Sequence, residues 1–421
     1  MRKLSIGRER SRSGPRVAKR SRGDWLARGV LAVAALVLGY ASFTHALANV
    51  IVKVDAQSAY TLAPQDGRIM AAYAWERFSA EPDPAPASQM SRLAARALLN
   101  DPTAVEAVNV LGLQAQLRSE DALADRVFGY STALSRRELS PQIWAIETAV
   151  ARGDVEGALR NYNVAMRTSR RARELLFPVL ASAIAEPGIR APLVEILADR
   201  SDWGERFIRY VPGRRGSDPR AVAALFDEAG GRGLSIADAE RARAVSGLVS
   251  AGLMDEAWAY YRTFRPGVDR SRSRDPGFTL GSNTPAPFDW RTGNSTGLSV
   301  AILQDGEGGL LDFSVPSGIR ASVVSQTQLL EPGSYRIQGR SSGIDQPERS
   351  RPYWALSCEN GRELGRVDVP NSQEGDGAFI GQFTVPAQCP VQILSLIVRA
   401  SDEISGVTGQ VRSVQLVPSP Q

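Results

Sequence analysis

The sequence predicts a multidomain chain with an N-terminal transmembrane helix, an all-α middle region and a C-terminal all-β sandwich. Three observations support this prediction. An uncharged stretch occupies residues 29–52, apolar residues recur at helical spacing over 67–265, and short runs suited to strands fill 278–418. The 421 residues leave room for two or three domains, and 43% hydrophobic with 23% charged residues is an ordinary globular composition.

The first element is a predicted membrane anchor. Residues 29–52 contain no Lys, Arg, Asp or Glu, and about 20 apolar residues are enough to span a bilayer's hydrocarbon core. Residues 1–28 hold ten Lys or Arg against two acids, and basic flanks stay on the cytoplasmic side. We therefore expect a single-pass protein of a bacterial inner membrane, with a basic cytoplasmic tail (1–28), an anchor in membrane lipid (29–52) and a periplasmic body.

The same stretch has a second interpretation, as a cleaved signal peptide. Residues 29–40 resemble the apolar core of a signal peptide, and Ala46-Leu47-Ala48 has the chemistry of a cleavage site. Apolar residues continue beyond that site through Val50, Ile51 and Val52, and the preceding segment is long for a signal peptide. The sequence favours an uncleaved anchor.

Charge and residue usage exclude several function classes. The tail carries +8 of a chain whose net charge is +5, so the rest carries −3, and a near-neutral body does not favour nucleic-acid binding. Structural zinc needs four ligands, whereas the chain has two cysteines and one histidine, His45, inside the hydrophobic stretch. We expect no metal and no other cofactor.

The middle region, residues 67–265, shows short helical segments separated by turns and a period of 34 residues. Ala124 recurs as Ala158, and Phe128 recurs as Tyr162. This period, with a small residue four positions before an aromatic one, resembles the tetratricopeptide repeat, in frames 71–104, 105–138 and 139–172. The resemblance implies that small residues let paired helices approach while the aromatic residues fill the seam between repeats. The predicted packing residues are Gly112, Ala124, Phe128, Gly153, Ala158 and Tyr162.

The repeat is degenerate. Ser119 stands where the turn glycine belongs in the second frame, and a later signature, Gly252 with Ala257 and Tyr261, is out of phase with 34. We therefore predict a tetratricopeptide-like α-solenoid. The resemblance implies binding of a peptide or protein on a concave face, and the alternative is a helical spacer.

Residues 266–277 are polar and rich in Arg, Ser, Pro and Gly, which predicts a linker. Regularly spaced strand runs follow over 278–418 and predict two packed sheets. Three motifs, Phe288-Asp289-Trp290, the turn before Tyr335, and Trp354–Cys358, resemble the jelly-roll sandwiches of carbohydrate-binding modules and galactose-binding-like domains.

That resemblance implies exposed aromatic rings that stack on sugars. The candidates are Trp290, Tyr353 and Trp354. Because Tyr353 and Trp354 are adjacent in a predicted strand, they point to opposite faces, and at least one belongs in the core. Asp289, Asp305, Glu307 and Asp312 match no calcium loop, so we expect solvated loop carboxylates.

The chain has two cysteines, Cys358 and Cys389, and is predicted to be exported. An even number of cysteines in an exported protein favours a disulfide over two separate buried thiols.

The chain contains no motif for a hydrolytic triad, a phosphate-binding loop or a metalloprotease. The leading hypothesis is a non-catalytic, membrane-anchored scaffold, similar to accessory proteins of bacterial envelope polysaccharide systems. In it the solenoid binds a protein partner in the cell envelope and the sandwich contacts a polysaccharide or a protein. The alternatives are a stand-alone carbohydrate-binding protein on a helical spacer and a glycosidase that uses paired carboxylates, which needs no histidine.

Overall fold

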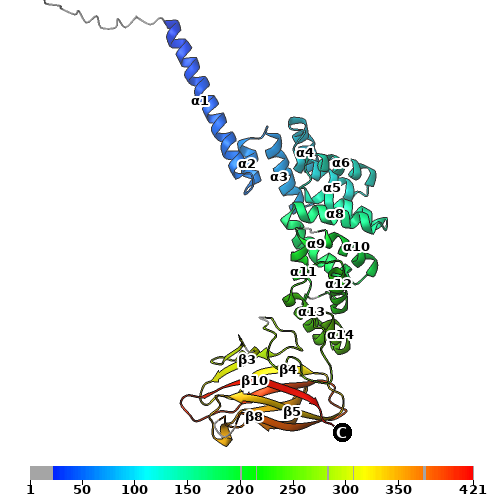
Figure 1. The fold of residues 1–421 in the computed structure, drawn as a ribbon. Helices are drawn as coiled ribbons and strands as arrows, with labels where there is room; N and C mark the ends of the chain where they lie inside the picture. The colour runs from blue at the N-terminus through cyan, green and yellow to red at the C-terminus, as the bar shows by residue number, and fades with distance from the viewer. Residues whose placement is uncertain are drawn as a thin grey trace, which may run out of the picture. The chain divides into compact units, whose positions relative to one another are not determined.

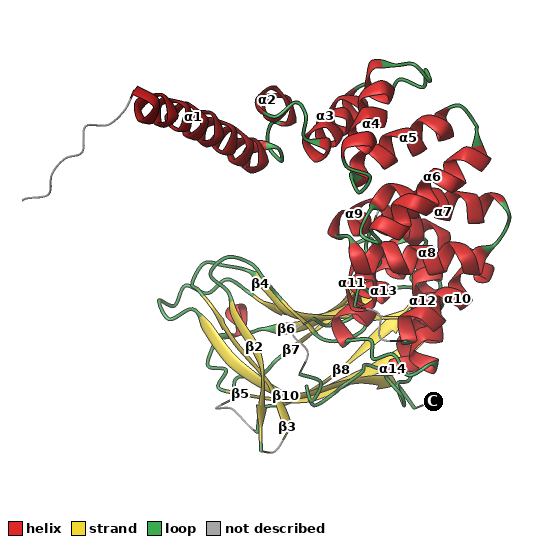
Figure 2. Cartoon of the chain, turned by 90° about the horizontal axis from the view of Figure 1, so that it is seen from above, coloured by secondary structure: helices red, strands yellow, loops and turns green. Residues whose placement is uncertain are grey.

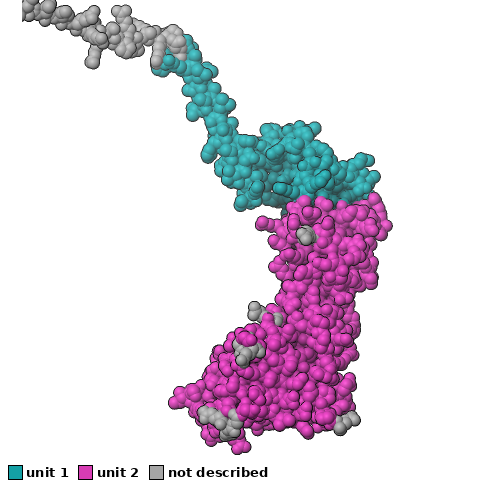
Figure 3. All heavy atoms as spheres, in the orientation of Figure 1, with its two compact units in different colours: residues 1–145 teal, residues 146–421 magenta. Residues whose placement is uncertain are grey.

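The computed structural model describes residues 22–199, 202–214, 216–281, 284–306, 308–372 and 376–420. The chain divides into two compact units, residues 1–145 and 146–421 (Figure 3). The predicted fold class is confirmed, because helices make up the N-terminal part and two five-stranded antiparallel sheets the C-terminal part (Figure 1 and Figure 2). Residues 1–21 of the predicted tail lie outside the described residues.

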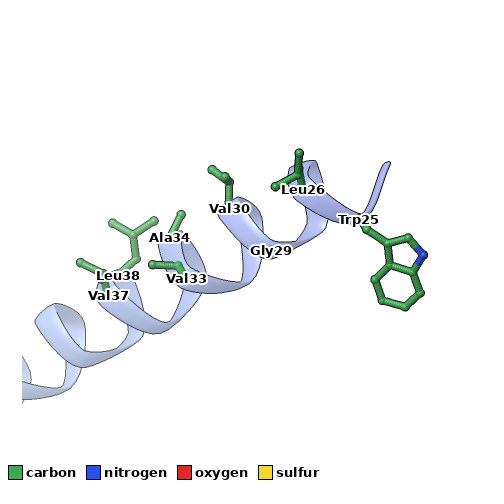
Figure 4. Close-up of a pocket in the computed structure, with 8 residues that line it drawn as sticks. All are labelled: Trp25, Leu26, Gly29, Val30, Val33, Ala34, Val37 and Leu38. Carbon is green, nitrogen blue, oxygen red and sulfur yellow. The ribbon is translucent and has the colours of Figure 1, made fainter. Parts of the chain in front are cut away.

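Helix α1 (Arg22–Ile51) is, within the described ranges, the one helix long and apolar enough to cross a membrane. Residues 25–43 are exposed throughout, and side chains such as Val30 and Leu38 stand out from a bare helix (Figure 4). At 1.5 Å per residue this exposed stretch is about 28 Å long, close to the hydrocarbon thickness of about 30 Å. The end of α1 is packed instead, because Ala48 is fully buried in a cluster with Ala59 and Ile69.

After α1 and α2, the helices of unit 1 form two hairpins, α3 with α4 and α5 with α6, close to the first two predicted frames. The bounds of these helices are α2 (Ala56–Leu62), α3 (Gly67–Ala80), α4 (Gln89–Asn100), α5 (Val105–Leu117) and α6 (Asp121–Leu134). Helix α7 (Leu139–Ala151) crosses the boundary between the units. The Asp66 carboxylate caps α3 by accepting the backbone N–H groups of Arg68 and Ile69, which would otherwise lack partners.

Small residues set the packing of the α5–α6 hairpin. A Cβ placed on Gly112 would lie 2.7 Å from Cε1 of Phe128, so only glycine fits against that ring. Ala124 and Phe128 are buried with Ala115. Between the two helices Ser119 takes φ 59°, the left-handed conformation that the turn glycine of a repeat normally supplies.

Unit 2 continues the hairpins. Its helices are α8 (Val155–Thr168), α9 (Arg170–Ala183), α10 (Pro187–Ala198), α11 (Gly204–Tyr210), α12 (Pro219–Gly231), α13 (Asp238–Ser250) and α14 (Met254–Phe264). Gly153 has φ 70° in the turn before α8, where Ala158 and Tyr162 are buried. Gly252 has φ 75° between α13 and α14, so the out-of-phase signature also makes a hairpin.

The sandwich consists of two sheets, ordered β1-β4-β9-β6-β7 (sheet A) and β2-β3-β10-β5-β8 (sheet B). The strands of sheet A are β1 (Arg291–Thr292), β4 (Ala321–Gln328), β9 (Gln392–Val398), β6 (Tyr353–Cys358) and β7 (Glu363–Asp368). Those of sheet B are β2 (Ser299–Asp305), β3 (Gly308–Val315), β10 (Val407–Pro418), β5 (Gly333–Ser342) and β8 (Ala378–Val385). A short 3-10 helix, η1 (Glu348–Ser350), precedes β6. Alternate residues face inward, and the inward set from both sheets forms one core.

The segment predicted as a linker, residues 266–277, connects α14 to the sandwich and packs against β10. Ser273 exchanges hydrogen bonds with the backbone of Leu416, and the Val414 N–H donates to the carbonyl of Pro276. The segment therefore lies against the C-terminal half of β10 without forming a strand of its own. The composition, rich in Arg, Ser and Pro, is typical of a loop, and the segment is a loop that is hydrogen-bonded to β10.

Candidate functional site

The three aromatic candidates lie in the interior or are covered. Trp290 is 4% exposed, Tyr353 1% and Trp354 0%. Trp354 faces the core, where its ring lies 5.8 Å from that of Trp290, and Trp290 donates its indole N–H to the carbonyl of Asp275. Tyr353 points to the outer face of sheet A but arginine side chains cover it. The expectation that these rings present open faces to a sugar is wrong, because Trp290 and Trp354 pack in the sandwich core and arginine side chains cover Tyr353.

Cys358 and Cys389 are joined by a disulfide in the structure. It links the last residue of β6 to the loop before β9. The amide of Gln392 sits beside it, accepting the Leu330 N–H and donating to the carbonyls of Leu330 and Cys389. These contacts hold the loops at this end of the sandwich together.

Asp289 is not the solvated carboxylate that the sequence suggested. It is 4% exposed and accepts hydrogen bonds from the Tyr261 hydroxyl at 2.5 Å and the Ala286 N–H at 3.0 Å. Nη2 of Arg265 lies 3.9 Å from Oδ2 of Asp289, the oxygen that accepts from Ala286. Burial and the neighbouring carboxylate raise the pKa of Tyr261, so its hydroxyl stays protonated and donates.

The other acids of that set do not build a cation site. Asp312 accepts a hydrogen bond from the Gln410 amide, Glu307 lies outside the described residues, and the side chain of Asp305 is not described. Among the residues that the structure describes, no three His, Cys, Asp or Glu side chains are grouped to hold a metal.

Arg274, in the segment between α14 and β1, contacts both α14 and the sandwich. It is 3% exposed and donates to the carbonyl of Phe288 at 3.1 Å, to Oε1 of Gln328 at 2.7 Å and to the carbonyl of Thr327. Its guanidinium also lies over the Trp258 ring of α14, 5.6 Å from the centroid. Burial lowers the pKa of Arg274 to about 10, which leaves it charged at neutral pH. The last helix and the sandwich are therefore bonded directly.

The candidate site is a groove on the outer face of sheet B. It has a volume of about 430 Å³. Residues from three strands and the docked segment line it: Pro276, Gln338, Gly339, Arg340, Ala378, Phe379, Ile380, Ser413 and Gln415. The register places Gln415, Gln338 and Ile380 side by side across β10, β5 and β8. The next row across the same strands is Ser413, Arg340 and Ala378. We call these two rows the amide groove.

The amide groove offers hydrogen-bonding groups beside an apolar surface. Within the described chain, the side-chain amides of Gln338 and Gln415 have no hydrogen-bond partner, and the Arg340 guanidinium pairs only with Asp376 at 3.0 Å. Ile380 is 67% exposed. Each glutamine amide both donates and accepts, so the row can pair with hydroxyl groups in either role.

This site was not predicted from the sequence. The alternation of inward and outward residues along the strands does show that both glutamines face outward. Gln338 lies between Ile337 and Gly339, and Gln415 lies between Val414 and Leu416, so both amides must face outward. The sequence alone does not show that β5 and β10 are neighbours in one sheet, which is what brings the two amides together.

Comparisons with known proteins give weak similarities. No family model and no curated protein matches the chain. Among solved structures, it is similar to TmCBM61 in complex with β-1,4-galactotriose (16% identity, 35% of this chain and 97% of that chain, TM-score 0.25). It is also similar to Pseudomonas aeruginosa PilF (14%, 59% and 96%, TM-score 0.25). A third match is a family 6 carbohydrate-binding module from Clostridium cellulolyticum in complex with xylose (14%, 32% and 98%, TM-score 0.20). At these scores the similarities support no conclusion about a ligand.

Proposed function

We propose that this chain is a non-catalytic, membrane-anchored scaffold that binds a saccharide chain in the amide groove. The helical hairpins bind a protein partner in the cell envelope, and the body lies in the periplasm, in the biosynthesis or export of an envelope polysaccharide. The observation that carries the proposal is the groove with its two unpaired glutamine amides. The proposal has three further parts: the membrane location, the protein partner and the polysaccharide process. They rest on the sequence and not on the groove.

The chemistry of the groove favours a saccharide. Sugar rings present several hydroxyl groups and small apolar C–H faces, and the groove sets Gln338, Gln415 and Ser413 beside the exposed Ile380. Its volume of about 430 Å³ lies in the usual range for small-ligand sites. The aromatic lining residue Phe379 is 5% exposed and packs in the core, so it offers no open face to a sugar. Binding then rests on hydrogen bonds, and we expect weak affinity for each sugar unit.

Catalysis has no support in the groove. A paired-carboxylate glycosidase needs two acids flanking the bond that is cleaved. No Asp or Glu is among the described residues that line the groove, and the nearby Asp376 is engaged by Arg340. A binding site is the simpler interpretation.

The packing of α1 supports an uncleaved anchor. Cleavage after Ala48 would remove the helical turn that carries this residue, which is fully buried against the start of the folded unit. The exposed stretch that remains, residues 25–43, matches the bilayer thickness by itself. One observation supports a protein partner for the hairpins. Leu175 and Val179 lie one turn apart on α9 and are 49% and 54% exposed, so they offer a small apolar surface.

The groove is tested with the full-length chain in mild detergent. A glycan array identifies a saccharide, and titration then compares the wild type with Gln338→Ala/Gln415→Ala. Loss of two charge-free hydrogen-bonding groups should weaken binding by roughly tenfold to a hundredfold. Gln382→Ala, an exposed glutamine outside the groove on β8, is the matched control and should bind as the wild type does. The proposal would be contradicted if no saccharide bound on the array, or if Gln382→Ala weakened binding as much as the double substitution.

Topology and partner need separate experiments. An alkaline phosphatase fused to the C-terminus should be active if the body is periplasmic, and an inactive fusion of normal abundance would place it in the cytoplasm. Cross-linking and mass spectrometry of the tagged protein from its native membrane should enrich polymerase, flippase or export subunits. Recovery without partners would favour a stand-alone carbohydrate-binding protein in which the hairpins are a spacer.

A further inference from the structure

Three arginine side chains converge on one tyrosine at the outer face of sheet A. Guanidinium carbons of Arg399 and Arg366 lie 4.4 Å and 5.1 Å from the centroid of the Tyr353 ring. Arg320 donates from Nη2 to the Tyr353 hydroxyl at 2.7 Å. Tyr353 begins β6, at the opposite end of the strand from the disulfide. We call this group the arginine cluster.

The charges of the arginine cluster are only partly balanced. Arg366 pairs with Glu363 at 2.8 Å, and Arg399 pairs with Asp368 at 2.7 Å. Within the described residues, Arg320 has no carboxylate partner, and its one hydrogen bond goes to the phenol oxygen. One exposed guanidinium is thus held in place by a buried ring while most of its five N–H donors stay unused.

Like charges so close repel one another, so the uncompensated arginine has a cost unless an anion offsets it. The guanidinium fork matches the two oxygens of a carboxylate, and such charge-assisted pairs are stronger than neutral hydrogen bonds. The Tyr353 hydroxyl fixes one nitrogen of Arg320, which reduces the side-chain freedom that an anion would otherwise have to restrict.

Small hydroxyl side chains lie beside the cluster. In the next row across the sheet, Ala355 is flanked by Arg366 on β7 and by Ser395 on β9, and Ser325 on β4 follows. The hydroxyls of Ser325 and Ser395 have no hydrogen-bond partner in the described part of the chain, and both residues are half-buried. A row of small side chains leaves the arginine donors unobstructed and supplies groups that pair with sugar hydroxyls.

We propose that the arginine cluster is a second saccharide subsite, which takes the carboxylate of an acidic sugar such as a uronate. The inference rests on the proposed function, because it assumes that the sandwich binds a saccharide. Arg320 holds the carboxylate, Arg366 and Arg399 add positive potential, and the serines contact ring hydroxyls. The unpaired hydroxyls beside the cluster favour a sugar over an acidic peptide.

The experiment titrates the full-length chain in detergent with an oligogalacturonate and with the same oligosaccharide after methyl esterification, which removes the charge. The charged form should bind roughly tenfold more tightly at low salt, and this advantage should shrink as salt rises. Arg320→Gln should abolish the advantage. Arg262→Gln removes the same charge from an exposed position on α14, outside sheet A, and should keep it.

The outcomes separate the two proposals. If both oligosaccharides bind equally and Arg320→Gln has no effect, the arginine cluster is not a subsite, while the amide groove is unaffected. If Gln338→Ala/Gln415→Ala loses the esterified ligand but keeps binding to the charged one, the cluster stands and acts independently. Binding to anionic phosphatidylglycerol vesicles with no response to oligogalacturonate would overturn the saccharide assignment in favour of a lipid headgroup.

Discussion

The helical hairpins and the junction between α14 and the sandwich are stabilised by different kinds of side chain. In the hairpins, Gly112 and Ala124 pack against Phe128, and charged groups form exposed pairs such as Arg68 with Asp101. At the junction, Arg274 and Asp289 are buried with their hydrogen bonds satisfied.

This difference determines what a substitution costs. Contacts within a hairpin join residues that are close in sequence and bury a few methyl groups. A substitution there should therefore disturb only that hairpin. The junction joins residues far apart in the sequence through buried polar groups, and removing one leaves several others without partners. The comparison predicts that the largest losses of stability come from the junction.

Arg274→Met is the strongest test of that comparison. The substitution leaves the carbonyls of Phe288 and Thr327 buried without a donor, and we expect a loss of about 3–5 kcal/mol in the free energy of unfolding. Chemical denaturation of the full chain measures it. Arg272→Met, which breaks an exposed pair with Asp269, should cost less than about 1 kcal/mol. Equal losses of stability in the two variants would mean that the buried hydrogen bonds of Arg274 contribute no more than an exposed ion pair.

Removal of the disulfide should rank second. Cys358→Ala/Cys389→Ala opens a loop of 31 residues, for which chain entropy predicts a loss of about 3 kcal/mol. The unfolding midpoint with and without reductant checks this value. The reductant should shift the wild type and leave the variant unchanged, and a shift in both would point to some other reducible group.

Gly112→Ala tests the hairpin packing in unit 1. The new methyl group would enter the Phe128 ring, and overpacking of this kind costs about 1–3 kcal/mol. Gly129→Ala in α6 is the matched control, because no atom lies within 4 Å of its added methyl group. That variant should gain up to about 1 kcal/mol through helix propensity. Stabilisation by both substitutions would show that the contact with Phe128 is loose.

Ser119→Gly should stabilise the same hairpin slightly. Ser119 has φ 59°, where a side chain is strained, and glycine relieves this at the cost of a more flexible unfolded chain. The expected gain is about 0.5–1 kcal/mol. The reverse change, Gly153→Ser at φ 70°, should destabilise. A loss of stability in Ser119→Gly would indicate that the serine contributes more than its backbone conformation.

The smallest predicted effect depends on pH. Burial, followed by the nearby Glu106, raises the pKa of Glu138 above 4.5. A carboxyl whose folded-state pKa is raised stabilises the fold at low pH, and this contribution is lost as pH rises from 4.5 through the folded pKa. Glu138→Gln should therefore be more stable than the wild type at pH 7 and should lack this slope. A steeper slope in the variant would contradict the assignment.

The repeats were predictable because their signals are local. A period of 34 residues fixes which small and aromatic side chains meet, and the α5–α6 and α7–α8 helices begin and end within the predicted frames. The strands were also visible from alternation. The roles of Trp290 and Trp354 were not, since a large aromatic residue in a strand is equally compatible with a core and a binding face until the sheet partners are known.

The candidate sites depend on non-local pairing. Gln338 and Gln415 are neighbours only because β10 pairs with β5, and Arg320 reaches Tyr353 only because β4 and β6 both pair with β9. The docking of residues 273–276 on β10 was hidden for the same reason. A single sequence contains no signal for such pairs.

The most direct test of the central claim is hydrogen exchange of the full-length chain with and without a saturating neutral saccharide. We predict slower exchange in residues 336–340, 378–382 and 413–417, the three strands of the amide groove, with the helices of unit 1 unchanged. Slower exchange confined to other segments, or none at saturation, would contradict saccharide binding in this groove.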